Sequence, residues 1–541
     1  MFQSEKRNLF MKLKKEWGCN TKKEITQEEA DQIPCYFQHL FKKSKIKEPY
    51  IDDITWNDLD MDKVFQRIDH TRSSVGEGYL YFLLRTPVSD QSILDERERL
   101  ITFFTENEEK RIQTEACFET IGRTKKYSIS DYIDRLFKLE KEKNIWHYFA
   151  LFTIPFSFLI MLLVSVNVGF AVMILLTVFN IFKYYKRKGQ IEPYLTTFGY
   201  ILRMLDISRE LSELKIEEIG DYTGRMKEVQ KHFKKFRRGS YLLMSSNRTT
   251  GSLLDALLDY IRILTHIDLI KFNSMLEEVK KNVNDVEILI ENAGILDAMI
   301  SIASFRKSLS SFCVPQLFYD LKVSFKAEEI YHPLLLDPVT NSIDEKKGML
   351  LTGSNASGKS TFLKTIAINA IMAQSIHTCT AASYKSCFYQ IYSSMALKDN
   401  LQEKESYYIV EIRSLKRILN HSRDELPMLC CIDEVLRGTN TIERISASAQ
   451  ILKSLAKENV FCLAATHDIE LTHLLEAEYD NYHFQEEVKD GDIIFNYRLH
   501  KGKAVTRNAI RLLGMMGYQE TIIENAEKTA AHFMETGEWI L

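Results

Sequence analysis

The residues best suited to chemistry form a glycine-rich loop at positions 353–360. Its sequence, GSNASGKS, matches the phosphate-binding pattern G-x-x-x-x-G-K-[ST] at every fixed position. In such a loop backbone N–H groups curl around phosphate oxygens, the catalytic Lys359 reaches the β- and γ-phosphates, and the Ser360 hydroxyl ligates Mg²⁺. We therefore expect a nucleoside triphosphate and Mg²⁺ as cofactors. The expected nucleotide-binding residues here are Gly353, Ser354, Asn355, Ala356, Ser357, Gly358, Lys359, Ser360 and Thr361.

Two carboxylates and a histidine follow further apolar runs. Asp433 and Glu434 end the run 428–432 in a Walker-B arrangement. We expect Asp433 to hold Mg²⁺ through water and Glu434 to polarise the attacking water. His467 follows the run 460–465, and we expect it to be catalytic on the γ-phosphate side. The alternatives are an ordinary acidic pair at a strand end and a capping or packing histidine.

Short apolar runs and a helix must position these groups. Residues 348–352 are typical of a strand that enters the loop, and residues 362–374 of the helix that leaves it. Strand, loop and helix in this order are the context that the phosphate-binding pattern requires. With the runs before Asp433 and His467, this order predicts an α/β P-loop domain built on a parallel sheet.

The composition sets bounds on the whole chain. Its 541 residues suggest two to four domains. Lys+Arg 71 against Asp+Glu 74 gives a net charge of −3, so no global charge points to nucleic acid. Gly 21 and Pro 9 are few for this length, which favours long helices. Nine cysteines without a CxxC pair indicate reduced intracellular thiols rather than a disulfide framework or zinc site.

A long uncharged segment interrupts the middle of the chain. Residues 145–182 are 38 residues without a formal charge, close to twice the ~20 residues of one membrane helix. The polar break at 165–169 favours two spans, about 145–164 and 168–183, with Asn167 and Gly169 in the turn. The alternatives are one long span and a hairpin buried in a soluble core.

Basic residues flank this segment on both sides. The positive-inside rule suits both flanks at once only if the segment is a hairpin with both ends in the cytoplasm. We therefore predict a multi-pass protein of the cell membrane, with two helices, contact with membrane lipid through 145–183, and both termini in the cytoplasm. The flanking residues are Lys138, Lys141 and Lys143 before the segment and Lys183, Lys186, Arg187 and Lys188 after it.

Together the motifs resemble the MutS family of ATPases. Thr352 before the loop and Asn355 within it are similar to that family's TGPNxxGKST, and residues 433–441 are similar to its DE-x-x-RGT-S/T run. Residues 406–411 are similar to its S-x-F-x-x-E segment, and Thr466-His467 matches its switch histidine. Further similarity, which extends the resemblance to about residues 50–140 and 250–530, lies at 71–76, Pro87, Arg97, 296–303, 314–315, 331–333 and 503–526.

The resemblance implies ATP as the nucleotide and a pair of ATPase domains that complete each other's sites. By this resemblance Gly438, Thr439 and Asn440 would face the partner's nucleotide, and each chain alone would be a poor ATPase. A helix N-cap at Thr439 or Asn440 is the plainer interpretation and is compatible with it. The implied partners are a second copy of the chain, as a homodimer, and double-stranded DNA.

The chain also departs from the family pattern. The core-like pattern begins near residue 50, where the family would have an N-terminal mismatch-reading domain, so we expect that domain to be missing. Residues 338–341 (PVTN) stand where the family supplies an aromatic side chain to stack on adenine. A basic run at 225–238 with Phe233 and Phe236 suits phosphate backbones or anionic lipid headgroups, and a solvated helix face explains it as well.

These observations predict five segments. They are an N-terminal helical arm at 1–48, the first part of a helical core at 49–144, a transmembrane helical hairpin at 145–183, the second part of the core, or lever, at 184–325, and a MutS-like ATPase domain in the cytoplasm at 326–541.

Three functions fit this organisation. The first is a membrane-anchored ATPase that hydrolyses ATP at a composite dimer interface and couples it to DNA binding. The second is the same ATPase acting on a protein or lipid partner, without mismatch recognition. The third is a switch that binds ATP without turnover. The presence of Lys359, Ser360, Asp433 and Glu434 speaks against the third.

Overall fold

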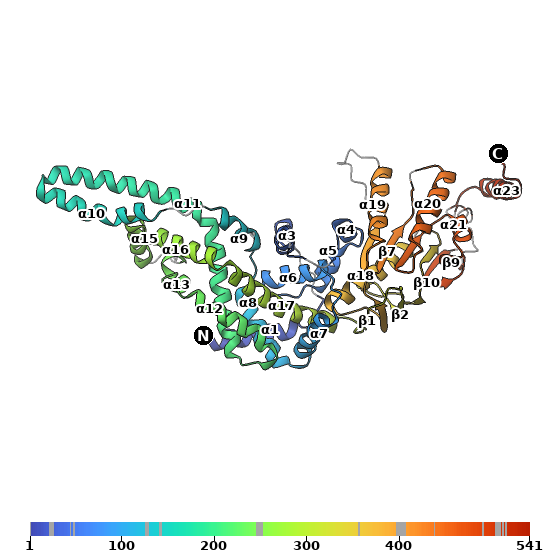
Figure 1. Cartoon of the computed structure of the whole chain (residues 1–541), viewed down its shortest axis with the longest axis horizontal. Coiled ribbons are helices and arrows are strands. Elements are labelled where there is room, and N and C mark those ends of the chain that lie inside the picture. Colours follow the sequence, from blue (N-terminus) through green and yellow to red (C-terminus); the bar gives the residue numbers. More distant parts are fainter. Residues whose placement is uncertain are drawn as a thin grey trace. The chain divides into compact units, whose positions relative to one another are not determined.

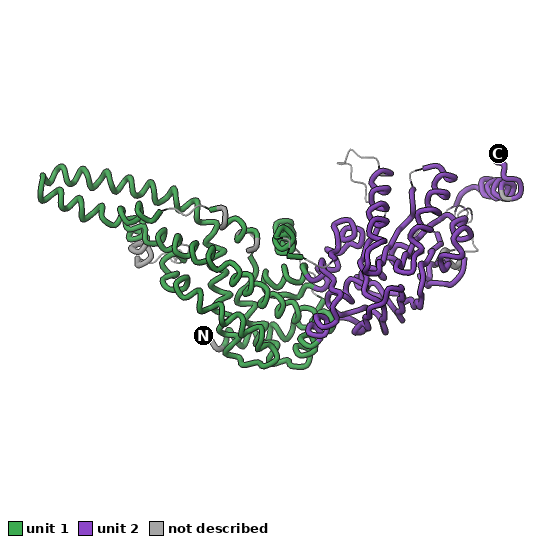
Figure 2. Tube along the Cα trace, viewed as in Figure 1, with its two compact units in different colours: residues 1–46, 69–82, 99–307 green, residues 47–68, 83–98, 308–541 purple. Residues whose placement is uncertain are grey.

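The structure is a computed structural model that describes residues 2–540 apart from 21–25, 44, 47–48, 125–128, 140–142, 245–252, 355–356, 396–406, 438, 490–491, 504–509, 511–512 and 514–516. The chain divides into two compact units (Figure 2). Unit 1 comprises residues 1–46, 69–82 and 99–307, and unit 2 comprises residues 47–68, 83–98 and 308–541. The segments 47–68 and 83–98 therefore cluster with residues 308–541, whereas the sequence analysis placed 49–144 in the helical core.

Unit 1 is helical throughout its described residues (Figure 1). Two further helices, α6 (Ser74–Arg85) and α7 (Gln91–Glu106), have residues in both units. The elements of unit 1 are α1 (Phe2–Glu16), α2 (Gln27–Ala30), α3 (Cys35–Lys42), α8 (Glu108–Ile121), α9 (Ile129–Lys138), α10 (Ile145–Leu163), α11 (Val166–Glu213), the 3₁₀ helix η1 (Glu217–Ile219), α12 (Gly220–His232), α13 (Lys234–Arg237), α14 (Tyr241–Met244), α15 (Leu253–Thr265), α16 (Ile267–Lys281) and α17 (Val283–Lys307).

Helix α17 forms the centre of the core of unit 1. It is apolar and long enough to cross a membrane, but 83% of its apolar window is buried inside the protein. Leu296, Met299 and Ile302 are fully buried, and helices α11 and α12 pack against α17. Burial of such side chains contributes roughly 1.5–3 kcal/mol each, so α17 stabilises the helical unit as a core element.

Helices α10 and α11 form a helical hairpin that extends beyond the other helices of unit 1 (Figure 1). The break between them is short, because α10 ends at Leu163 and α11 begins at Val166. Ser165 is the N-cap of α11, and its hydroxyl accepts the Val168 N–H at 3.3 Å. The prediction that Asn167 and Gly169 form the turn is therefore wrong, since both lie in the first turn of α11. Helix α11 also continues without a break past residue 183.

The apolar side chains of the hairpin are exposed. Only 17% of the apolar window of α10 and 11% of that of α11 are buried inside the protein, and both helices are long and apolar enough to cross a membrane. Leu162 is 84% exposed and Leu175 is 70% exposed. The alternative of a hairpin buried in the chain's own core therefore does not hold.

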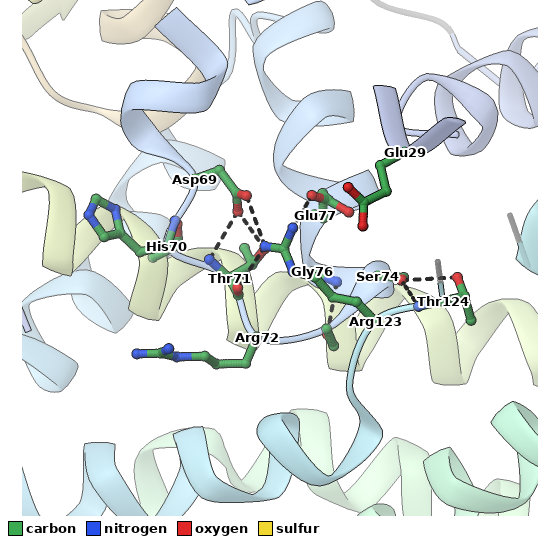
Figure 3. A network of polar contacts seen from close by, with 12 residues as sticks. Glu29, Asp69, His70, Thr71, Arg72, Ser74, Gly76, Glu77, Arg123 and Thr124 are labelled. Carbon is green, nitrogen blue, oxygen red and sulfur yellow. Dashed lines mark hydrogen bonds and ion pairs between the residues drawn. The ribbon is translucent and has the colours of Figure 1, made fainter. Parts of the chain in front are cut away.

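A buried ion-pair network fixes the segment 69–77 in unit 1 (Figure 3). The Arg123 guanidinium donates to Asp69 at 2.9 Å and to the carbonyl oxygen of Thr71 at 2.8 Å, and it also pairs with Glu77. The Asp69 side chain is 1% exposed, so this pair holds a desolvated charge. The segment 71–76, which is similar to the MutS family, is thus held to the residues around Arg123 within unit 1.

The basic run 225–238 lies on α12, α13 and the residues that join and follow them. Phe233 and Phe236 are fully buried, so the prediction of aromatic groups accompanying an exposed basic surface is wrong. Lys231 pairs with Glu228 at 2.7 Å on the surface of α12. The run is an amphipathic helix face whose phenyl rings belong to the core.

Unit 2 contains the predicted α/β domain. Its larger sheet has the order β10-β9-β4-β8-β7-β6, in which β9, β4, β8, β7 and β6 are parallel neighbours and β10 is antiparallel to β9. The strands are β4 (Met349–Thr352), β6 (Gln390–Ser394), β7 (Met428–Asp433), β8 (Val460–Ala465), β9 (Asp480–Lys489) and β10 (Asp492–Lys501). This arrangement confirms the parallel sheet and the three strands predicted to carry the site.

A smaller sheet and several helices complete unit 2. The smaller sheet has the order β1-β5-β2-β3. Its strands are β1 (Gln316–Phe318), β2 (Phe325–Ile330), β3 (Asn341–Glu345) and β5 (Ser383–Cys387). The helices are α4 (Asp53–Asp58), α5 (Met61–Ile68), α18 (Lys359–Ile376), α19 (Tyr407–His421), α20 (Thr441–Leu455), α21 (Ile469–Leu474) and α23 (Glu520–Thr536).

Polar contacts attach the segment 47–68 to the α/β domain. Asp58 accepts hydrogen bonds from the Ser393 hydroxyl at 2.6 Å and the Met395 N–H at 3.0 Å, next to the end of β6. Asp60 pairs with Lys364 of α18 at 2.6 Å. These partners lie more than 300 residues away in the sequence, so no local pattern indicates the attachment.

Candidate nucleotide site

The glycine-rich loop connects β4 to α18 and needs its glycines. Gly353 and Gly358 have φ values of 144° and 107°. A residue with a side chain would be strained in this backbone conformation, whereas glycine adopts it readily. A Cβ on Gly353 would lie 2.8 Å from the carbonyl oxygen of Phe484. The loop can therefore approach a ligand with its backbone. The predicted site residues Asn355 and Ala356 lie outside the described residues.

Lys359 and Ser357 lie inside this loop. The Lys359 ammonium donates to the carbonyl oxygens of Gly353 and Ser354, both at 2.7 Å. These bonds hold the lysine head within the loop, where an anion would meet it. The Ser357 hydroxyl is buried and has no hydrogen-bond partner among the described residues, so it has a free donor at the same place.

Ser360 and Asp433 meet across the edge of the sheet. Ser360 is the second residue of α18, and its hydroxyl donates to Asp433 Oδ2 at 2.5 Å, at the end of β7. The Asp433 carboxylate is buried. A hydroxyl and a carboxylate are hard oxygen ligands of the kind that Mg²⁺ takes in partial sets, with water and phosphate oxygens supplying the rest. The pair fits the metal-binding role predicted for these two residues.

Glu434 is held by two neighbours at the same edge. Its Oε1 lies 2.9 Å from His467 Nε2, and its Oε2 pairs with the Arg437 guanidinium. Burial raises the pKa of Glu434, but the hydrogen bond from His467 and the charges of Arg437, His467 and Lys359 outweigh burial and keep that pKa below its ordinary value. The carboxylate is therefore ionised at neutral pH and can accept a proton.

The turn after β7, at residues 434–436, has positive φ angles and is held by a second carboxylate, that of Glu411. Glu434 and Leu436 have φ values of 56° and 61°. The Leu436 N–H donates to Glu411 Oε1 at 2.5 Å, which holds the turn after β7. Burial raises the pKa of Glu411, and the backbone hydrogen bonds oppose that rise. Glu411 was not predicted as a site residue, and its only signal was the similarity at 406–411.

The segment predicted to face a partner's nucleotide forms a helix start. Asn440 is the N-cap of α20, and its side chain accepts the Ile442 N–H at 2.9 Å. The Thr439 hydroxyl donates to Glu443 at 3.2 Å. These contacts confirm the capping interpretation and leave the role toward a partner as a prediction. Gly438 lies outside the described residues.

The glycine-rich loop and the carboxylates of Asp433 and Glu434 line one cavity of about 530 Å³. Its lining includes Ser357, Gly358, Lys359, Ser360, Thr361, Asp433 and Glu434. Among the described residues no group of three His, Cys, Asp or Glu side chains forms a metal site. The lining therefore offers phosphate and Mg²⁺ contacts rather than a protein-only metal cage.

The cavity is also lined by residues that sequence reasoning did not assign to the site. Tyr497 comes from β10 and is 45% exposed, and His332 and Tyr331 precede β3. Burial lowers the pKa of His332 to about 4, so its ring is neutral at pH 7 and offers an uncharged flat surface. Tyr331 and His332 lie in the segment 331–333, where the sequence is similar to the MutS family. Nothing in the sequence indicated that Tyr497 would line the cavity.

Comparison with known proteins agrees with this geometry. Residues 349–534 match the family model of MutS domain V. The chain is 30% identical over 266 residues to MutS protein homolog 4 of Homo sapiens, covering 46% of this chain and 28% of that protein. It is 30% identical over 303 residues to DNA mismatch repair protein MutS of Leptospira interrogans, covering 52% and 35%. The same-named protein of Methanosarcina mazei is 27% identical over 273 residues, covering 48% and 30%.

The fold and the site thus define a P-loop α/β domain of the MutS domain V type. The chain is MutS-like, as the sequence motifs predicted. The aligned part spans about a third of the length of these curated relatives.

Proposed function

We propose that the chain binds and hydrolyses ATP with Mg²⁺. One observation carries this proposal: Ser360 and Asp433 meet in the cavity that also holds Lys359 and the ionised Glu434. Lys359 would neutralise phosphate charge, Ser360 and Asp433 would hold the metal, and Glu434 would take the proton of the attacking water. Mg²⁺, when bound, supplies charge stabilisation at the phosphates.

The catalytic site of each chain is completed by a second copy in this proposal. Thr439 and Asn440 stand at an exposed helix start, from which they can donate to a phosphate across a dimer interface. Each chain alone would then hydrolyse ATP slowly, and the rate per chain would rise with protein concentration.

Mixing two inactive variants tests the composite site. Lys359→Ala disables a chain's own loop. Thr439→Ala with Asn440→Gly removes the donors offered to the partner, and glycine retains most of the capping stability. After random 1:1 mixing about half of the dimers are mixed and hold one complete site, so activity returns to about a quarter of the wild-type value. No recovery from two variants that still form dimers would exclude the composite site.

We further propose that the hairpin α10–α11 anchors the protein in the cell membrane with both termini and the ATPase domain in the cytoplasm. Exposed apolar helices of this length are costly in water and suited to a bilayer, and their basic flanks favour the cytoplasm. Ser165→Cys in the turn should react with a membrane-impermeant thiol reagent only from the outside of the cell. The exposed native Cys19 should react only from the cytoplasmic side. Reaction of both thiols from one side would refute this topology.

The ATPase would be coupled to DNA in the first form of this proposal, because two of the relatives are named as DNA mismatch repair proteins. The second form couples it to a protein or lipid partner at the membrane. ATPase rate against protein concentration, with and without double-stranded DNA, separates them. A rate that rises with concentration and again with DNA supports the first form, and indifference to DNA supports the second.

A further inference from the structure

The histidine that contacts Glu434 lies in a turn that is itself held by hydrogen bonds. His467 stands between Thr466 and Asp468, where the chain passes from β8 to α21. The Thr466 N–H donates to the Leu351 carbonyl oxygen of β4 at 2.9 Å, and the Asp468 N–H donates to the Thr466 hydroxyl at 3.0 Å. The His467 side chain is 38% exposed, so packing confines only part of its surface. Its orientation toward Glu434 therefore depends on how this turn is fixed.

An ion pair with two hydrogen bonds connects this turn to α20. Arg444 of α20 donates from Nε to Asp468 Oδ2 at 3.0 Å and from Nη2 to Oδ1 at 2.6 Å. Two parallel bonds of this kind fix the plane of the carboxylate as well as its distance. The side chains of Arg444 and Asp468 are only 25% and 14% exposed. Water and salt therefore screen the pair less than a fully exposed one.

The plainer role for Asp468 would be to cap α21. It occupies the N-cap position of that helix, where an aspartate side chain commonly accepts a backbone N–H. The Asp468 side chain makes no such capping bond. Both of its oxygens accept from Arg444 instead. The carboxylate therefore serves the contact with α20 rather than the start of its own helix.

Arg444 is anchored at the start of α20, close to the site. Its N–H donates to the Asn440 carbonyl oxygen at 2.8 Å, which places it in the first turn of the helix. The hydrogen bond to Asp468 raises the pKa of Arg444 against the effect of burial, and the charges of Asp468 and Glu434 add to this rise. The guanidinium thus acts on the turn of His467 from a rigid helix and within the field of Glu434.

We propose that the ion pair of Arg444 with Asp468 is a positioning element for ATP hydrolysis, because it holds the turn that carries His467. With the turn held, the histidine ring keeps its contact with Glu434, and the base stays oriented toward the attacking water. This inference rests on the proposed ATPase function. Neither member of the ion pair is among the described residues that line the nucleotide cavity. The pair would therefore act on the rate of the chemical step and leave the binding of ATP largely unchanged.

Steady-state ATPase kinetics of the full chain with Mg²⁺ test this inference. Arg444→Gln and Asp468→Asn each remove one charge of the pair with little change in size. Each should lower kcat by roughly 10- to 100-fold, as misplacement of a reacting group by about 1 Å can do, and should change KM for ATP by less than about twofold. Lys453→Gln is the control, because Lys453 lies on the same helix and pairs with Glu478 at 3.7 Å. It should change neither value.

A double-mutant cycle separates positioning from a structural contribution. His467→Ala should lower kcat by removing the group through which the pair acts, and Arg444→Gln in that background should lower kcat no further. A pair that only stabilises the fold would instead multiply the two losses. Arg444→Lys keeps the charge but not the planar fork and should recover part of kcat. Thermal unfolding shows that each variant is folded, and Asp468→Asn takes the place of Arg444→Gln in the cycle if that variant does not fold.

The outcomes distinguish this inference from the ATPase on which it rests. Multiplied losses in the His467→Ala background would overturn the inference, and so would a wild-type kcat in His467→Ala or in both variants of the pair. A raised KM with unchanged kcat would overturn it as well. Each of these results leaves the proposed ATPase intact when Lys359→Ala abolishes turnover. ATP hydrolysis that is absent from the wild type, or retained by Lys359→Ala, would overturn the proposed function and this inference with it.

Discussion

The Nε2 atom of His467 lies 2.9 Å from Oε1 of Glu434, so the carboxylate that ends β7 is oriented by the histidine that follows β8. The two strands are parallel neighbours in the sheet, and the contact therefore depends on their register. Arg437 holds the other carboxylate oxygen. A base held from both sides loses little orientational freedom when water approaches, which is what proton transfer requires.

Replacing Glu434 tests its assignment as the base. Glu434→Gln should bind ATP and Mg²⁺ about as well as the wild type but hydrolyse ATP at least ~10²-fold more slowly. Any closed dimer should accumulate with ATP. Single-turnover hydrolysis and nucleotide binding measure the two effects separately. Glu458→Gln, at a side chain 79% exposed, is the control and should change neither. Equal turnover by Glu434→Gln would remove Glu434 from this role.

The buried Asp297 makes the stability of the chain depend on pH. Burial raises the pKa of Asp297 to about 6, against the hydrogen bonds from Ser73 and the backbone of Arg72 and Ser73 and the charge of Arg123. The folded chain thus holds this proton more tightly than the unfolded chain, whose value is near 3.8. Below pH 4 the Asp297 carboxyl is protonated in both states and does not lower the free energy of unfolding. As pH rises from 4 to 6, its ionisation lowers that free energy by at most about 3 kcal/mol.

Denaturant unfolding of the wild type and Asp297→Asn, followed between pH 4 and 7, measures this effect. The free energy of unfolding of the wild type should fall relative to that of the variant as pH rises, whatever the offset between them. A difference that stays constant across this range would show that Asp297 does not titrate there.

The Arg123 network should be a large contributor to the stability of unit 1. Arg123→Met removes the ion pair with the buried Asp69 carboxylate, and we expect the free energy of unfolding to fall by about 3 kcal/mol. Arg135→Met is the matched control, because the Arg135 side chain is 60% exposed and its ion pair with Asp131 spans one turn of the same helix. It should cost less than about 0.5 kcal/mol. Thermal unfolding in detergent compares them, and similar losses would contradict a special role for Arg123.

Two glycines of α11 should respond in opposite ways to alanine. A Cβ at Gly169 would lie 2.6 Å from the backbone nitrogen of Met161, so Gly169→Ala should push α10 and α11 apart and lower the melting temperature of the hairpin. Nothing lies within 4 Å of a Cβ at Gly189, so Gly189→Ala should stabilise the helix by about 0.5–1 kcal/mol. Thermal unfolding of both variants in detergent measures the contrast. Equal shifts would indicate that the close helix contact is absent.

The proximity of the glycine-rich loop, Asp433 and Glu434 could be predicted because phosphate-binding chemistry fixes residue types at short spacing. Gly353, Lys359 and Ser360 lie in one loop, and Asp433 and His467 directly follow apolar strands, so parallel pairing brings them together. Tyr497 could not be predicted in the same way. It reaches the cavity from an antiparallel edge strand, and its place depends on tertiary packing.

In the helical elements, one feature could have been predicted from the sequence and was not, and another could not have been predicted. Met226, Val229, Phe233 and Phe236 recur at helical spacing and are all buried, so the periodicity of the basic run already indicated a core face. The attachment of the segment 47–68 to unit 2 had no such signal. It depends on ion pairs such as Asp60 with Lys364, whose partners are far apart in the sequence.

Helix α11 runs unbroken for 48 residues, about 72 Å at 1.5 Å per residue, from the hairpin turn to Glu213 in the helical core. A continuous helix of this length transmits rotation, because its hydrogen-bonded backbone resists bending except at a residue such as Pro193. Tilting its core end by about 5° about its midpoint would move each end by roughly 3 Å. The same rod would therefore convert small rearrangements among α8, α12 and α17, which pack on it, into a change in the angle at which the hairpin leaves the helical core.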